Sequence, residues 1–344
     1  MKNYWILLFI LRLSTTFAQK QEVDLKVRIK AQNMPTKVAI AEMATTTSHR
    51  WEVRNLTAVE LEPYSIARNR QMPMVYTAPT DFAVDDYNGT IKSWGDLGTF
   101  YHQLNSNRTA LPTDFSAKIK ALVANEKTDV ARIKKLYEYL QNNTRYVSIQ
   151  LGIGGWQTMT ATDAATKGFG DCKALTNLMG AMLTDIGIKS YPVLVRAGED
   201  EADILYDFPS FQFNHVFVCV PNNKDTLWLE CTSQTNPMGY LGTFTGNRHV
   251  LLITEKESKL LKTPSLTPTD NAQLRKSLIV LKENGEAKAS VKTMYKGEQQ
   301  EKFAAVLHHM TASDQRKWLE GDLDLPSVEI EKYGWVEQRD RVPM

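Results

Sequence analysis

The stretch that most constrains the fold is an apolar helix that begins at Cys172 and follows a loop containing glycines. Its apolar residues recur at helical spacing: Ala174, Leu175, Leu178, Met179, Met182, Leu183 and Ile186. This periodicity predicts a helix buried in a core, and Gly187 is typical of the residue that ends one. Gly168 and Gly170 let the preceding loop approach closely. The sequence therefore places Cys172 in the first turn of a buried helix.

That position suits a nucleophile. A helix N-terminus carries unpaired N–H groups and a positive partial charge, which favour a thiolate. A cysteine that only packs in the core is an equally open interpretation. Asp171 is expected to cap the helix rather than act as a catalytic acid. Lys173 either helps to hold a thiolate or lies exposed to solvent.

A histidine interrupts an aromatic stretch further along the chain. Residues 211–220 are rich in aromatic and β-branched residues on both faces, as in an interior strand. His215 shares a face with Phe217, because side chains alternate along a strand. A polar ring on such a face needs a partner, which is more often structural than catalytic. Residues 226–232 are expected to return as a second strand after a turn at 221–225.

The returning strand supplies that partner. With an even-length loop, the expected register pairs Val220 with Leu227, Cys219 with Trp228, and Phe217 with Glu230. Glu230 then lies on the face of His215, one diagonal step away and within side-chain reach. An odd loop would turn one strand over and separate them. The same register puts Cys231 on the face opposite to Cys219, so we expect no disulfide between these two.

Cys172, His215 and Glu230 together have the chemistry of a catalytic triad. Cys172 would attack an amide carbonyl and form a thioester, His215 would move the proton, and Glu230 would orient the imidazole. The backbone N–H of Cys172 is the first expected donor to the oxyanion. Trp156 or Gln157, in the glycine-rich loop upstream, is the second, although core packing explains Trp156 equally well.

Composition excludes several other functions. The net charge of +2 comes from mixed acids and bases, so we expect no nucleic-acid partner. HExxH and CxxC motifs are absent, and loop 151–157 lacks the GxxxxGK[ST] phosphate pattern, so neither a metal nor another cofactor is expected. The expected partner is a peptide or protein amide substrate. The sequence does not indicate the oligomeric state.

The chain begins with Lys2, a short apolar run and small residues ending at Ala18, as in a secretory signal peptide. A membrane anchor is the alternative, but the run is shorter than the roughly 20 apolar residues of a membrane span, so no stable insertion is expected. The protein is therefore expected to be exported, to the periplasm or the medium. Three cysteines leave at least one thiol unpaired within the chain.

We expect four segments: a signal peptide at 1–18, a β-rich domain at 22–110, a catalytic core at 112–260, and a β-rich domain at 270–344. Trp51-Glu52-Val53-Arg54 alternates as a strand does. Residues 112–142 look helical, and 262–270 look like a linker. The chain stops at Met344 without a closing element, so an incomplete last domain is an open alternative. A partial domain at 22–110 is also an open alternative.

Several stretches together resemble the transglutaminase-like superfamily: Gly168 to Leu175, Asn214-His215-Val216, and Trp228 to Thr232. The resemblance covers roughly residues 115–255. It implies an α+β, papain-like core in which the cysteine helix packs on an antiparallel sheet, with β-rich domains of unknown function on either side. It also implies the roles of Cys172, His215 and Glu230, although the family usually has Asp where this chain has Glu230.

The resemblance leaves two interpretations open. The first is a cysteine peptidase or amidase, because bacterial members are more often suspected of hydrolysis than of cross-linking. The second is an inactive core that binds a peptide or a cell-envelope fragment, because Glu230 could mark a member that has lost activity. A plain structural role is a third, lesser interpretation.

Overall fold

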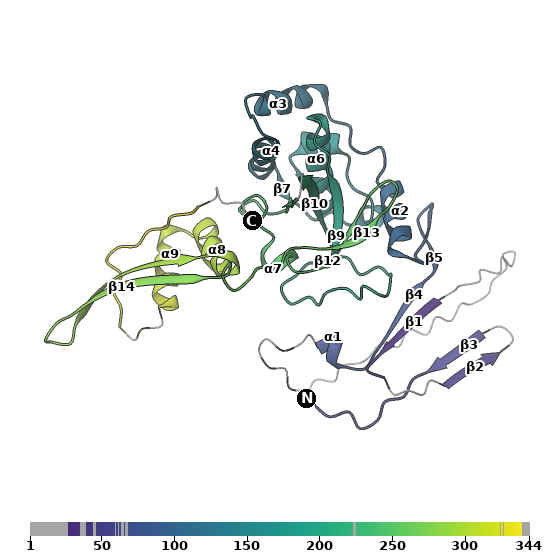
Figure 1. Ribbon diagram of the computed structural model, residues 1–344, viewed down its shortest axis with the longest axis horizontal. Helices are drawn as coiled ribbons and strands as arrows, with labels where there is room; N and C mark the ends of the chain where they lie inside the picture. The colour runs from purple at the N-terminus through teal and green to yellow at the C-terminus, as the bar shows by residue number, and fades with distance from the viewer. Residues whose placement is uncertain are drawn as a thin grey trace.

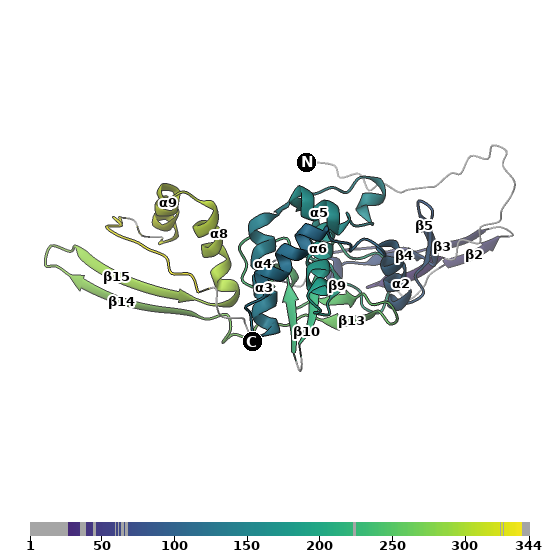
Figure 2. The ribbon, with the colours of Figure 1, turned by 90° about the horizontal axis from the view of Figure 1, so that it is seen from above.

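The computed structural model describes residues 27–338 apart from 35–38, 44–45, 59, 61, 63–64, 66–67, 223–224, 324 and 326. The expected signal peptide at 1–18 and the chain end at 339–344 lie outside these residues. The described chain forms three parts that follow one another in sequence and lie in a row when seen from above (Figure 2). The central part lies between the other two (Figure 1).

The first part is built from three two-stranded antiparallel sheets and two helices. Strand β1 pairs with β4, β2 with β3, and β5 with β6. The bounds are β1 Val27–Gln32, β2 Ala39–Met43, β3 Thr46–Arg50, α1 Arg68–Gln71, β4 Met74–Pro79, β5 Asp81–Val84, β6 Tyr87–Thr90 and α2 Trp94–Leu104. The expected strand at 51–54 was wrong, because β3 already ends at Arg50.

Helix α2 was not expected, since residues 22–110 were interpreted as strands and turns. It begins with a capping box, in which Ser93 accepts from the N–H of Asp96 and the Asp96 carboxylate accepts from the N–H of Ser93. Leu97, Phe100 and Leu104 bury one face of the helix. Gly95 and Gly98 weaken the helical pattern of this segment in the sequence.

Gly98 lets α2 touch the loop that joins two strands of the central sheet. A Cβ at Gly98 would lie 2.1 Å from the Cβ of Ser258, whereas one at Gly95 would have nothing nearer than 3.5 Å. We expect Gly98→Ala to lower the free energy of unfolding by about 1–3 kcal/mol through overpacking. Gly95→Ala, its control in the same helix, should be neutral or stabilising. Urea unfolding of both variants checks this, and equal effects would contradict it.

The central part has α3, α4 and α6 on one side of a five-stranded sheet (Figure 1). Of these three helices, α6 packs on the sheet, and α3 and α4 pack on α6. The helices and short strands before the sheet are α3 Thr113–Val123, α4 Asp129–Asn143, β7 Arg145–Tyr146, η1 Gly152–Gly155, α5 Ala161–Lys167, β8 Phe169–Gly170 and α6 Cys172–Asp185. The sheet has the order β11-β10-β9-β12-β13, with every neighbouring pair antiparallel.

The sheet and its connections come from β9 Tyr191–Val195, β10 His215–Asn222, β11 Asp225–Leu229, α7 Gly242–Thr245, β12 His249–Leu252 and β13 Lys259–Lys262. Helix α6 lies at the centre of the core, where Leu175, Leu178, Met179 and Met182 are 0–1% exposed. The predicted helix from Cys172 is thereby confirmed. Thr176 donates from Oγ1 to the carbonyl of Val216 at 3.1 Å, which ties α6 to β10.

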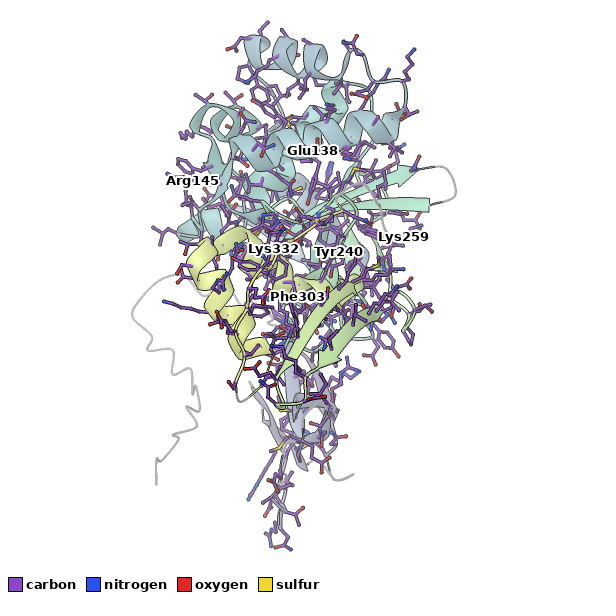
Figure 3. All side chains as sticks on the ribbon, turned by 90° about the vertical axis from the view of Figure 1, so that its left-hand side faces the viewer. Glu138, Arg145, Tyr240, Lys259, Phe303 and Lys332 are labelled. Atoms are coloured by element: carbon purple, nitrogen blue, oxygen red, sulfur yellow. The ribbon has the colours of Figure 1, made fainter. Side chains whose placement is uncertain are left out.

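The third part is a long hairpin covered near one end by helices. Its elements are β14 Gln273–Leu281, β15 Ala287–Tyr295, η2 Gly297–Gln300, α8 Glu301–His309 and α9 Ala312–Asp322. Tyr295 stacks on Phe303 with ring centroids 3.8 Å apart. The Glu301 carboxylate joins this part to the centre, because it accepts from the hydroxyls of Tyr240 and Thr243, both at 2.8 Å. Figure 3 labels Tyr240 and Phe303 at this junction.

No helix within the described residues combines the length and the apolar character that crossing a membrane requires.

Candidate active site

Cys172 is the first residue of α6 and is only 4% exposed. Asp171 is the N-cap, and its Oδ1 accepts from the N–H of Ala174 at 3.0 Å. Gly170 is needed for the approach to this turn, because a Cβ there would lie 2.4 Å from the Cβ of Ala174. The local sequence thus fixes the cysteine at the end of the helix where N–H groups have no partner within the helix.

The hairpin of β10 and β11 has the predicted register. Cys219 pairs with Trp228 and Val220 with Leu227. Strand β10 begins at His215 rather than at 211, so the expected strand was four residues too long at its start. Strand β11 ends at Leu229, immediately before Glu230.

His215 and Glu230 meet in the core. The Nε2 atom of His215 lies 3.0 Å from both carboxylate oxygens of Glu230. The two residues are 9% and 2% exposed, respectively. Thr232 adds a hydrogen bond from its hydroxyl to Glu230 Oε1 at 2.6 Å. The carboxylate is therefore held by two residues, and its distance from the imidazole is that of a direct hydrogen bond.

Cys172 lies close enough to His215 to be one of the groups that raise the pKa of its imidazole. Because Nε2 faces the carboxylate, Nδ1 is the ring nitrogen left for the sulfur. The structure thus brings Cys172, His215 and Glu230 into the same buried region, with His215 in direct contact with Glu230.

The electrostatics of the pair follow from burial and charge. Burial lowers the pKa of His215, but the Glu230 carboxylate and the Cys172 thiol outweigh burial and raise that pKa to about 10. Burial raises the pKa of Glu230. The charge of His215 and the hydrogen bonds from His215 and Thr232 outweigh burial, so the pKa of Glu230 is lowered overall. Both shifts favour the charged forms, an imidazolium beside a carboxylate.

Lys173 corrects one expectation. It is 7% exposed rather than solvent-facing, and its ammonium contacts the Asp171 carboxylate. The charge of Asp171 is thereby neutralised within the helix start, so Asp171 has a structural role there.

An oxyanion donor needs an N–H group that has no other partner, and the backbone N–H groups of Trp156 and Gln157 already have one. The backbone N–H groups of both residues donate to the carbonyl of Ile153, at 2.9 and 2.8 Å. The Gln157 side chain donates to the carbonyl of Leu104 at 2.9 Å and accepts from Arg108. Neither backbone is free to receive a substrate oxygen, and the Gln157 amide is already occupied.

The ring of Trp156 packs edge-on against Phe211, with centroids 4.7 Å apart. Phe211 lies on the loop that joins β9 to β10, which also carries Phe213 into the apolar cluster around Cys172. A donor role for the Trp156 indole stays a prediction.

Sequence reasoning missed two residues of the site. Thr232 follows Glu230 by two positions, a spacing at which a hydroxyl can reach back to a carboxylate, and this was a usable signal. Tyr101 of α2 lies in the apolar cluster of Cys172, where burial and the neighbouring Cys172 and Asp171 raise its pKa. No local pattern connects Tyr101 to a residue 71 positions later, and only the fold brings them together.

All three cysteines are free and buried. Within the residues that the structure describes, no group of three or more His, Cys, Asp or Glu side chains could hold a metal ion.

Comparisons with known proteins identify one family whose model matches part of the chain. Residues 116–236 match the family model of the Transglutaminase-like superfamily. A structure from Parabacteroides distasonis described as a "putative protease" is 14% identical, with a TM-score of 0.46 over 70% of this chain. This chain spans only 43% of that protein.

A second structure, a "putative cysteine protease" from Cytophaga hutchinsonii, is 10% identical, with a TM-score of 0.32 over 78% of this chain and 79% of that one. No curated protein matches the chain. The family match covers the helix of Cys172 together with His215 and Glu230. Residues 116–236 are thus similar to the transglutaminase-like core, and the described residues combine helices with antiparallel sheets in an α+β fold.

Proposed function

We propose that the protein is a cysteine-dependent amide hydrolase that acts on peptides or peptide-like amides through Cys172, His215 and Glu230. The observation that carries the proposal is the His215–Glu230 contact, in which Nε2 lies 3.0 Å from both carboxylate oxygens, at an imidazole whose pKa is also raised by the neighbouring Cys172. This order of nucleophile, base and orienting acid is the one that acyl transfer through a covalent intermediate requires.

In this mechanism His215 holds the proton of the thiol, and the Cys172 thiolate attacks the carbonyl carbon of the amide. The C–S bond forms, and the carbonyl oxygen becomes an oxyanion. The N–H of Cys172, one of the N–H groups that a helix leaves unpaired at its start, is the first donor to this oxygen. The oxyanion then collapses as the C–N bond breaks, and His215 gives its proton to the leaving amine. The neutral His215 takes a proton from a water molecule that attacks the thioester, and the C–S bond breaks to release the acid and return the Cys172 thiolate.

The length of Glu230 is compatible with this role. Compared with the Asp usual in the family it has one more methylene, yet its carboxylate still reaches the imidazole, and Thr232 holds it there at 2.6 Å. Replacement of Asp by Glu therefore does not by itself argue for lost activity.

Selective alkylation of Cys172 tests the proposal. Burial raises the pKa of Cys219 to about 12, and burial and the Glu230 charge raise that of Cys231 well above the ordinary value. We expect iodoacetamide at pH 7 to modify Cys172 more than roughly 100-fold faster than the other two, because the thiolate is the reactive form. Peptide mass mapping measures the rates, with Cys172→Ala as control. Equal, slow modification of all three cysteines would contradict the proposal.

One observation favours the second candidate, an inactive core that binds peptides. Cys172 is 4% exposed, so a substrate carbonyl reaches the sulfur only through a narrow opening or after a small movement. The alkylation experiment separates the two candidates, because an inactive binding core has no need of a reactive thiolate.

We further propose that the chain is exported through the segment at 1–18, and that the core at 112–260 lies between β-rich domains at 22–110 and 270–344. Cell fractionation of the tagged full chain tests export. Recovery of the protein in the cytoplasm with residues 1–18 intact would contradict it.

A further inference from the structure

An open pocket of about 200 Å³ lies beside the start of α6. Its wall is formed by Ile149, Ile153, Gly154, Gln157, Thr158, Met159 and Asp171. Asp171 is bonded to Cys172, so their Cα atoms are about 3.8 Å apart. A peptide whose carbonyl is held at the Cys172 thiol therefore places a nearby side chain beside this pocket.

The polar groups of the wall are already paired within the protein. Gln157 exchanges hydrogen bonds with Leu104 and Arg108. The Thr158 hydroxyl donates to the carbonyl of Met159 at 3.0 Å. None of these groups needs a partner from a ligand.

The charge in the wall is also neutralised. Asp171 accepts from the N–H of Ala174 through one oxygen and from the Lys173 ammonium through the other. What the wall offers to a ligand is apolar surface from Ile149, Ile153 and Met159. A charged side chain would lose its hydration there without gaining a partner, which is costly.

The volume fits one large side chain. A cavity of roughly 150 Å³ lined by aliphatic residues is enough to hold benzene, so a pocket of about 200 Å³ can take leucine or phenylalanine. We propose that this pocket selects substrates with an uncharged, apolar side chain within two residues of the scissile amide. The inference deepens the proposed function and rests on it.

The test uses the full chain with Cys172→Ala, which binds without reacting. Two blocked alanine peptide amides carry a central pair of leucines or of glutamates, so that either side of the scissile bond can reach the pocket. Calorimetry is expected to give a Kd about tenfold or more lower for the leucine peptide. Equal Kd values would overturn the inference.

A carboxylate introduced into the pocket wall should remove the preference for the leucine peptide over the glutamate peptide. Ile153→Asp, in the Cys172→Ala chain, is expected to reduce the Kd ratio of the two peptides to near one. Leu151→Asp is the matched control, because Leu151 lies in the same loop, is 88% exposed and is not part of the wall. Ile149→Asp, at a wall residue that is 41% exposed, repeats the test if Ile153→Asp fails to fold. A preference that survives both wall variants would overturn the inference.

Hydrolysis of the same peptides by the unmodified chain separates the two proposals. Leucine-selective binding without hydrolysis supports the pocket and contradicts the proposed function. Hydrolysis of both peptides at equal kcat/KM supports the proposed function and overturns the selectivity of the pocket.

Discussion

Glu230→Gln is expected to lower the free energy of unfolding by about 3–5 kcal/mol at pH 6, the usual cost of removing one partner of a buried ion pair. The variant keeps the size of the side chain but loses the charge that faces the His215 imidazolium across 3.0 Å. It also weakens the acceptor of the Thr232 hydroxyl. Urea unfolding measures the change. Glu230→Asp, which keeps the charge, should lose less stability, and equal losses would contradict an ion pair.

The pH dependence of this loss has a defined sign. The pKa of His215 is raised from 6.5 to about 10, so its contribution to stability is fully present below pH 6.5 and is lost as the pH rises toward about 10. The pKa of Glu230 is lowered from 4.5, so its contribution is present above pH 4.5 and is lost as the pH falls below that value. The difference between the parent chain and Glu230→Gln should therefore be largest near pH 4.5–6.5. A difference independent of pH would contradict the pairing.

His215→Ala is expected to lower kcat/KM for a peptide amide by about 10²–10⁴-fold, the usual contribution of a general base and acid. The double variant Cys172→Ala/His215→Ala should lose far less kcat/KM than the product of the fold decreases of the two single variants, because members of a triad act as a unit. Initial rates on a peptide substrate identified by screening measure both effects.

His249→Ala is the matched control for His215→Ala. His249 also pairs with a carboxylate, Nδ1 to Asp203 Oδ2 at 2.5 Å, and it lies on β12 of the same sheet. Its loss should leave kcat/KM nearly unchanged. A comparable fall in both variants would show that His215 acts only through the stability of the sheet.

The parts of the site that local rules govern could be predicted. The periodic apolar residues after Cys172 predicted the buried helix, and an even-length loop predicted the register of β10 and β11 that joins His215 to Glu230. Both follow from periodicity and strand alternation, which depend on near neighbours in sequence.

The features that depend on long-range packing could not be predicted from the sequence. Lys173 looked exposed from its type, but its ammonium is buried against Asp171. Helix α2 was missed because Gly95 and Gly98 weaken its pattern, and Gly98 is explained only by its contact with Ser258. The N–H groups of Trp156 and Gln157 were expected to face a substrate, but the turn of η1 uses them for the Ile153 carbonyl. In each case tertiary contacts overrode the local signal.

The central claim is that Cys172 and His215 form a thiolate–imidazolium pair, and the pH dependence of Cys172 alkylation tests it most directly. Rates with iodoacetamide should be measured from pH 4 to 10 in the parent chain and in His215→Ala. The account predicts fast modification of Cys172 below pH 7 that slows markedly when His215 is lost. Slow modification that rises only at alkaline pH, and is the same in both proteins, would contradict it.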